Sequence, residues 1–79
     1  MLPVIHKFQQ YDVFSRPAKI LTNDDKEIVM SMYHRSNIQK ILIDDWLCIQ
    51  LRAQEDDIIC IRDCNTDIYR LVIGRYPLL

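Results

Sequence analysis

The alternation of hydrophobic and polar positions is clearest in the last third of the chain. Residues 57–63 and 67–74 are two runs rich in Ile and Val, which are typical strand residues. The segment between them, "CNT", contains Asn65, a residue that suits a tight turn. The pattern predicts a C-terminal antiparallel β-hairpin.

The register of this hairpin depends on the length of its turn. If Asp63 faces Asp67, one face of the hairpin is apolar and packs on the core. The predicted core face holds Ile59, Ile61, Tyr69, Leu71 and Ile73. The predicted outer face is mixed and holds Ile58, Cys60, Arg62, Ile68, Arg70 and Val72. A shift of one residue would exchange such sets between the two faces.

The middle of the chain fits two interpretations. Residues 23–35 begin with acidic side chains and end with His34 and Arg35, the charge polarity of a helix. Thr22 or Asn23 can cap its start. The same residues also alternate as a strand pair would, with "NDDK" as its turn. We favour the helix because of its charge polarity.

Residues 36–54 are ambiguous in the same way. Apolar residues recur there at helical spacing: Ile38, Leu42, Trp46 and Ile49. From Ile41 onwards, apolar residues also alternate with the period of a strand. A helix followed by a strand, dividing near Asp44 and Asp45, reconciles the two patterns.

The first 22 residues read as extended structure because Pro3 and Pro17 disfavour helix. We therefore predict one domain over residues 1–79 with a small α+β fold. It has N-terminal strands, one or two central helices at 23–35 and 37–46, and the C-terminal hairpin. An all-β barrel of five or six strands is the alternative if neither helix forms.

Composition narrows the classes of partner. The net charge is −1, from 10 Lys and Arg against 11 Asp and Glu. Nucleic-acid-binding modules usually carry a basic excess, so a nucleic acid is a less favoured partner.

The absence of a signal-peptide pattern and of a long apolar run predicts a cytoplasmic protein with no membrane partner. An odd number of cysteines, three, fits free thiols in a reducing compartment.

The sequence offers little catalytic or metal-binding chemistry. Cys48, Cys60, Cys64 and His34 include the residue types of a zinc site. However, Cys60 and Cys64 are four residues apart on a predicted strand, and such positions lie about 13 Å from each other. That distance is too long for both thiols to bind one metal ion. Neither His34 nor His6 lies in a recognisable catalytic motif, and the single glycine rules out a Gly-rich phosphate loop. We expect no enzyme, no metal and no cofactor.

Two short stretches resemble known families. One resembles the helix-turn-helix of response regulators through Leu21, Thr22, Glu27, Ile28, Ser36, Asn37 and Ile41. This likeness implies DNA binding by a helix-turn-helix or winged helix, although the acidic start of the next stretch suits a recognition helix poorly. Residues 67–79 resemble a strand of the RelE/ParE toxin fold. That likeness implies a small RNase-like toxin.

The function we expect is that of a small cytosolic regulator, adaptor or inhibitor that is not an enzyme. It would act by docking on a larger protein, and a second copy of the chain is a further candidate partner. Trp, Tyr, Arg and Met concentrate binding energy at interfaces. The predicted partner-binding residues are therefore Arg62, Arg70, Arg75, Tyr69, Trp46, Tyr33 and Met32. DNA binding and RNase activity are the alternatives.

Overall fold

The structure is a computed structural model that describes residues 10–12 and 15–74. Two α-helices and five strands lie in that part of the chain. Their order is β1 (Gln10–Tyr11), β2 (Pro17–Ile20), α1 (Asn23–Met32), β3 (Gln39–Leu42), α2 (Trp46–Leu51), β4 (Ile58–Asp63) and β5 (Thr66–Ile73). A 3₁₀ turn, Arg35–Asn37, precedes β3.

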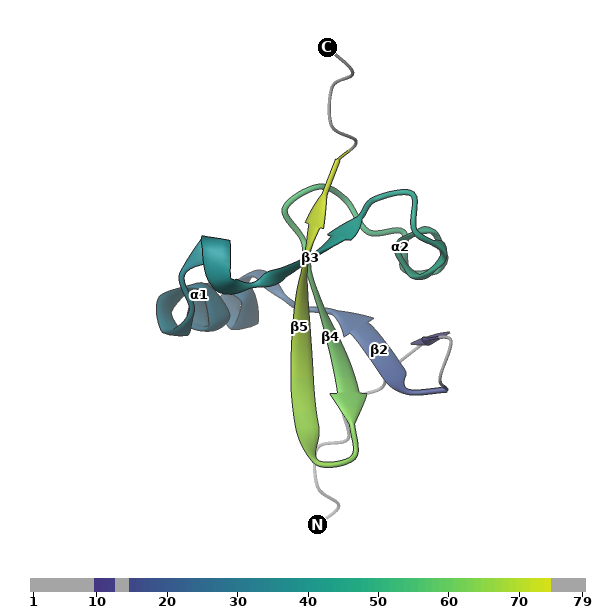
Figure 1. Cartoon of the computed structure of the whole chain (residues 1–79), viewed down its shortest axis with the longest axis horizontal. Coiled ribbons are helices and arrows are strands. Elements are labelled where there is room, and N and C mark those ends of the chain that lie inside the picture. The colour runs from purple at the N-terminus through teal and green to yellow at the C-terminus, as the bar shows by residue number, and fades with distance from the viewer. Residues whose placement is uncertain (1–9, 13–14, 75–79) are drawn as a thin grey trace.

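The strands form one mixed sheet in the order β1-β2-β4-β5-β3. All neighbours are antiparallel except β3, which runs parallel to β5. The two helices lie on opposite sides of the sheet (Figure 1). The predicted α+β class, with N-terminal strands and a C-terminal hairpin, is confirmed, and the all-β alternative is wrong.

Helix α1 forms where its charge polarity predicts it. The Asp25 N–H donates to the Thr22 hydroxyl (3.2 Å), so Thr22 is the N-cap. The helix ends at Met32, three residues earlier than predicted, because Tyr33 takes an extended conformation. Arg35 belongs to the following 3₁₀ turn, where its guanidinium pairs with Asp56 instead of compensating the end of α1.

The prediction for residues 36–54 has the right elements in the wrong order. The strand β3 comes first and the helix α2 second, so the helix predicted at 37–46 is wrong. The Leu47 N–H donates to the Asp45 carboxylate (3.0 Å). Asp45 therefore starts a helix at the point where the sequence interpretation ended one. A strand also stands where the helix-turn-helix resemblance requires a second helix.

The hairpin is confirmed, but its predicted register is wrong. The turn has two residues, Cys64 and Asn65, and Asp63 pairs with Thr66 instead of Asp67. Cys64 adopts a left-handed conformation, with φ 56°, which makes this tighter turn. The shift of one residue moves each β5 side chain to the other face. As a result Arg62 and Arg70 lie on opposite faces of the sheet.

The core has two layers because a helix covers each face. The layer on the α1 side contains Leu21, Val29, Ile38, Ile58, Cys60 and Leu71. The layer on the α2 side contains Ala18, Leu47, Cys48, Ile59, Ile61 and Val72. Strand β4 is therefore buried on both faces, which explains its unbroken apolar run. The prediction that Ile58, Cys60 and Val72 face away from the core is wrong.

Candidate functional site

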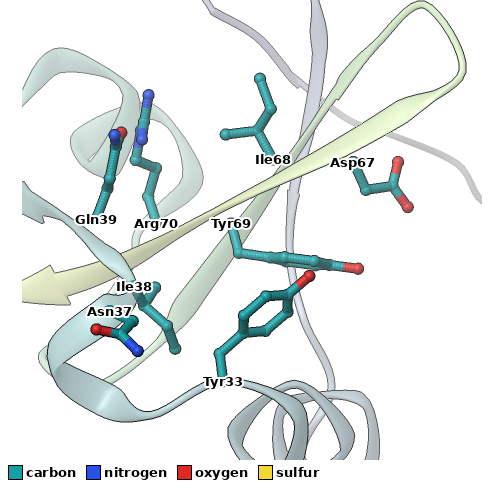
Figure 2. Close-up of a pocket in the computed structure, with 8 residues that line it drawn as sticks. All are labelled: Tyr33, Asn37, Ile38, Gln39, Asp67, Ile68, Tyr69 and Arg70. Atoms are coloured by element: carbon teal, nitrogen blue, oxygen red, sulfur yellow. The ribbon is translucent and has the colours of Figure 1, made fainter.

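A concave site lies at one edge of the sheet, beside β5. On this edge β3 pairs only with Arg70–Ile73, although β5 begins at Thr66. β4 pairs with Thr66–Tyr69 on one edge, but no described strand lies beside these residues on the β3 side, and we call this side of Thr66–Tyr69 the open edge. A pocket of about 390 Å³ lies along it, which we call the tyrosine pocket (Figure 2). The residues that line it are Tyr33, Asn37, Ile38, Gln39, Asp67, Ile68, Tyr69 and Arg70.

Two aromatic rings form one wall of the tyrosine pocket. Tyr33 follows α1 directly, and Tyr69 belongs to β5. Their ring centroids are 6.2 Å apart and the rings are tilted by 48°, a favourable arrangement for an aromatic pair. The two side chains lie next to each other in Figure 2. Tyr33 is 43% exposed, whereas burial raises the pKa of Tyr69. The pair thus offers an ordered, partly exposed apolar surface.

The charged groups of the pocket lie on both faces of β5. Arg62 Nε donates to Asp67 Oδ1 (3.0 Å), and this hydrogen bond raises the pKa of Arg62. Arg70, Gln39 and Ile68 point to the side of β5 opposite the two tyrosines (Figure 2). Within the described part of the chain Arg70 has no ion-pair partner. The pocket therefore combines a carboxylate that is paired with Arg62 and a guanidinium, that of Arg70, with no ion-pair partner among the described residues.

The backbone of the open edge also presents polar groups. The Val72 N–H donates to the Asp57 carbonyl (2.8 Å), and the Val72 carbonyl accepts from the Asp56 N–H (2.9 Å). In an antiparallel strand these groups alternate from one edge to the other. Those of Ile68 therefore face β4, whereas those of Asp67 and Tyr69 face outward along the open edge.

A smaller pocket of about 220 Å³ lies on the α1 side of the sheet and shares Asp67 and Tyr69 with the tyrosine pocket. Cys60 contributes to its lining but is almost fully buried. Burial raises the pKa of Cys60 to about 11. The thiol is therefore protonated at neutral pH and is a poor nucleophile there.

The three cysteines do not converge. Cys48 and Cys60 belong to core layers on opposite sides of the sheet, and Cys64 is exposed in the hairpin turn. Among residues 10–12 and 15–74 there is no group of three or more His, Cys, Asp or Glu side chains that could hold a metal ion. In the same residues, neither helix is long and apolar enough to cross a membrane.

In the structure, the predicted partner-binding residues do not all lie at one site. It brings Tyr33 and Tyr69 together, and Arg70 joins their pocket from the other face. Three others lie elsewhere: Arg62 lines the smaller pocket, while Met32 (63% exposed) and Trp46 (53% exposed) line neither. Trp46 begins α2, on the side of the sheet away from α1 (Figure 1). Arg75 lies outside the described residues.

The seven predicted partner-binding residues leave out five that line the tyrosine pocket: Asn37, Ile38, Gln39, Asp67 and Ile68, of which Ile68 was predicted on the mixed outer face. The first three precede or begin β3, which we had assigned to a helix. Asp67 and Ile68 lie on β5, where the error in register hid their position. A correct turn length would have placed Asp67 and Tyr69 on the same face of the sheet as Arg62 and Cys60 of β4.

Comparison with known proteins adds no family. No protein-family model matches the chain, and the curated proteins contain no significant match to it.

Proposed function

We propose that this protein is a small regulator, adaptor or inhibitor that acts by docking on a larger protein instead of by catalysis. The observation that carries the proposal is the Tyr33–Tyr69 pair at a sheet edge that β3 covers only in part. Tyr and Arg are enriched among residues that dominate binding energy. Two tyrosines and Arg70 line the tyrosine pocket, the tyrosines on one side of β5 and Arg70 on the other (Figure 2).

The polar chemistry of the pocket supports binding more than catalysis. Asn37 and Gln39 contribute amides, which orient ligands by hydrogen bonding. The Asp67 carboxylate accepts a hydrogen bond from Arg62 Nε (3.0 Å) and is already engaged within the hairpin. The nearby Cys60 thiol is buried and neutral at physiological pH. These groups can recognise a partner but do not form an activated nucleophile with its base.

Affinity capture with the full tagged chain tests the proposal. Lysate of the native host is treated with nuclease and washed at high salt, and the bound proteins are quantified. We expect one protein to be retained in stoichiometric amount by the wild type and lost with Tyr33→Ala. Tyr11→Ala is the matched control, because Tyr11 is equally an exposed aromatic (54%) but lies on β1, at the other edge of the sheet.

Two results would contradict the proposal. One is recovery that depends on nucleic acid and disappears with salt, which is typical of phosphate contacts. The other is retention of the partner by the Tyr33→Ala variant at the wild-type level. Circular dichroism of each variant checks that the substitution leaves the fold intact.

A further inference from the structure

We infer that the open edge of β5 receives an extended segment of the partner protein as an additional strand. That segment places an apolar side chain against Tyr33 and Tyr69 and a carboxylate at Arg70. The inference rests on the proposed docking function and specifies the chemistry of the partner.

The backbone provides the first reason. Outward-facing N–H and C=O groups of Asp67 and Tyr69 form a template for one more strand. β3 already pairs with this edge of β5 but begins at Gln39, opposite Arg70. An incoming strand would therefore lie in line with β3 and complete the pairing of β5. Main-chain hydrogen bonds of this kind require an extended partner but not a particular sequence.

The absence of edge protection provides the second reason. Proteins usually protect exposed edges with Lys, Pro, bulges or very short strands. β3, the outermost strand on this side, has only four residues and carries Lys40. The open edge carries neither Lys nor Pro. Its one charged side chain, Asp67, is paired with Arg62 across the hairpin and does not repel an approaching strand as an isolated charge would.

The side chains provide the selectivity. Residues of an added strand alternate between the two faces. The residue opposite Tyr69 would point to the α1 side, where the two tyrosines form an apolar wall. The residue opposite Ile68 would point to the other side, diagonal to Arg70 and within reach of a long side chain. Since Arg70 has no ion-pair partner among the described residues, Glu fits this position best.

Titration with capped octapeptides, followed by NMR of the ¹⁵N-labelled full chain, tests the inference. The first peptide alternates Val and Glu, the second alternates Val and Lys, and the third is the Val/Glu peptide N-methylated at alternate residues. We expect the first to shift the amide signals of Asp67 and Tyr69 and to slow their hydrogen exchange. The second should bind about tenfold more weakly, since a charge-assisted hydrogen bond is lost. The third should not bind, because it lacks the required N–H groups.

Reversal of the charge at residue 70 tests whether Arg70 selects the carboxylate. Arg70→Glu should invert the preference, so that the Val/Lys peptide binds about tenfold better than the Val/Glu peptide. The control is Arg52→Glu, which makes the same charge change at an exposed site at the end of α2. This control should keep the wild-type preference. An unchanged preference in Arg70→Glu would overturn the assignment of the carboxylate.

Other outcomes separate this inference from the proposed function. If the N-methylated peptide binds as tightly as the unmethylated Val/Glu peptide, the peptide docks on the tyrosines without strand pairing. Shifts at Asp67 and Tyr69 that appear when the chain alone is concentrated would identify a second copy as the occupant. Either result overturns the inference. If the Tyr33→Ala variant still fails to capture the partner, the proposed function remains supported. If that variant captures the partner as well as the wild type does, the proposed function is overturned too.

Discussion

At the scale of single residues, the three cysteines have contrasting environments. Cys48 and Cys60 are buried, and burial raises the pKa of each thiol from 9.0 to about 11. Cys64 is exposed in the turn between β4 and β5. Because only the thiolate reacts readily, burial protects two of the thiols both by exclusion of reagent and by protonation.

Alkylation should distinguish these thiols. With iodoacetamide at pH 8, we expect one equivalent to react with the folded protein, at Cys64. Cys48 and Cys60 should react only after denaturation in urea. Peptide mass spectrometry identifies the modified positions. Rapid labelling of Cys60 under native conditions would show that the layer between α1 and the sheet opens easily.

The same raised pKa values predict a loss of stability at alkaline pH. In the unfolded chain the two thiols titrate near the ordinary thiol pKa of 9.0, and in the folded chain their pKa is about 11. Between these values the unfolded state has lost thiol protons that the folded state keeps. The free energy of unfolding should therefore be constant with respect to these groups below about pH 8 and fall between pH 9 and 11. Urea unfolding across this range measures the effect, and a Cys48→Ala, Cys60→Ala double variant should show a shallower decline.

The hairpin turn contains a conformational cost that one substitution should remove. Cys64 has φ 56°, a region that costs a residue with a Cβ about 1–2 kcal/mol. Cys64→Gly should therefore stabilise the protein by about 0.5–1 kcal/mol, after the larger backbone entropy of glycine in the unfolded state is deducted. Cys64→Ala is the control and should bring no gain, since it removes the thiol but keeps the Cβ. Denaturation midpoints in reducing buffer compare the variants.

At the scale of elements, α1 depends on its N-cap. The helix has ten residues and buries one side chain, Val29, so little packing compensates for the loss of a cap. Thr22→Ala should reduce the free energy of unfolding by about 1 kcal/mol. Thr22→Ser keeps the hydroxyl that accepts from the Asp25 N–H and should retain most of the stability. Equal losses in the two variants would exclude the cap hydrogen bond as the cause.

Strand β5 is the element that links fold and function. One of its edges pairs with β4 along most of its length, and the other pairs with β3 only from Arg70 onwards. The proposed docking site exists because β3 is shorter than β5. A longer β3 would cover the open edge and the tyrosine pocket with it.

At the scale of the whole molecule, the two core layers make neighbouring residues of β4 contribute equally to stability. Ile58 and Ile59 point to opposite faces, yet both are fully buried. Ile58→Val and Ile59→Val should each cost about 0.5–1.5 kcal/mol. Ile49→Val is the control, because Ile49 is 59% exposed on α2, and it should change stability little. If either β4 variant behaves like the control, one face of the sheet is not packed.

Local patterns in the sequence determined several features of this protein. The β-branched runs and the turn residue Asn65 specify the C-terminal hairpin, and Thr22 with the acids that follow it specifies the start of α1. Such signals act between residues close in sequence, so they can be recognised without knowledge of the fold. They also placed Tyr33 at the end of a helix and Tyr69 on a strand, two of the residues that form the candidate site.

Only the tertiary structure decided how these elements meet. Residues 39–51 fit a helix or a strand equally well by periodicity, and pairing of Gln39–Leu42 with β5 selected the strand. A turn one residue shorter than assumed separated Arg62 from Arg70, because side chains of a strand alternate between faces. The apolar run in β4 is compatible with several registers, and burial on both faces removes the alternation that would indicate one. The open edge arises from the unequal lengths of two strands that lie far apart in sequence, which local patterns do not encode.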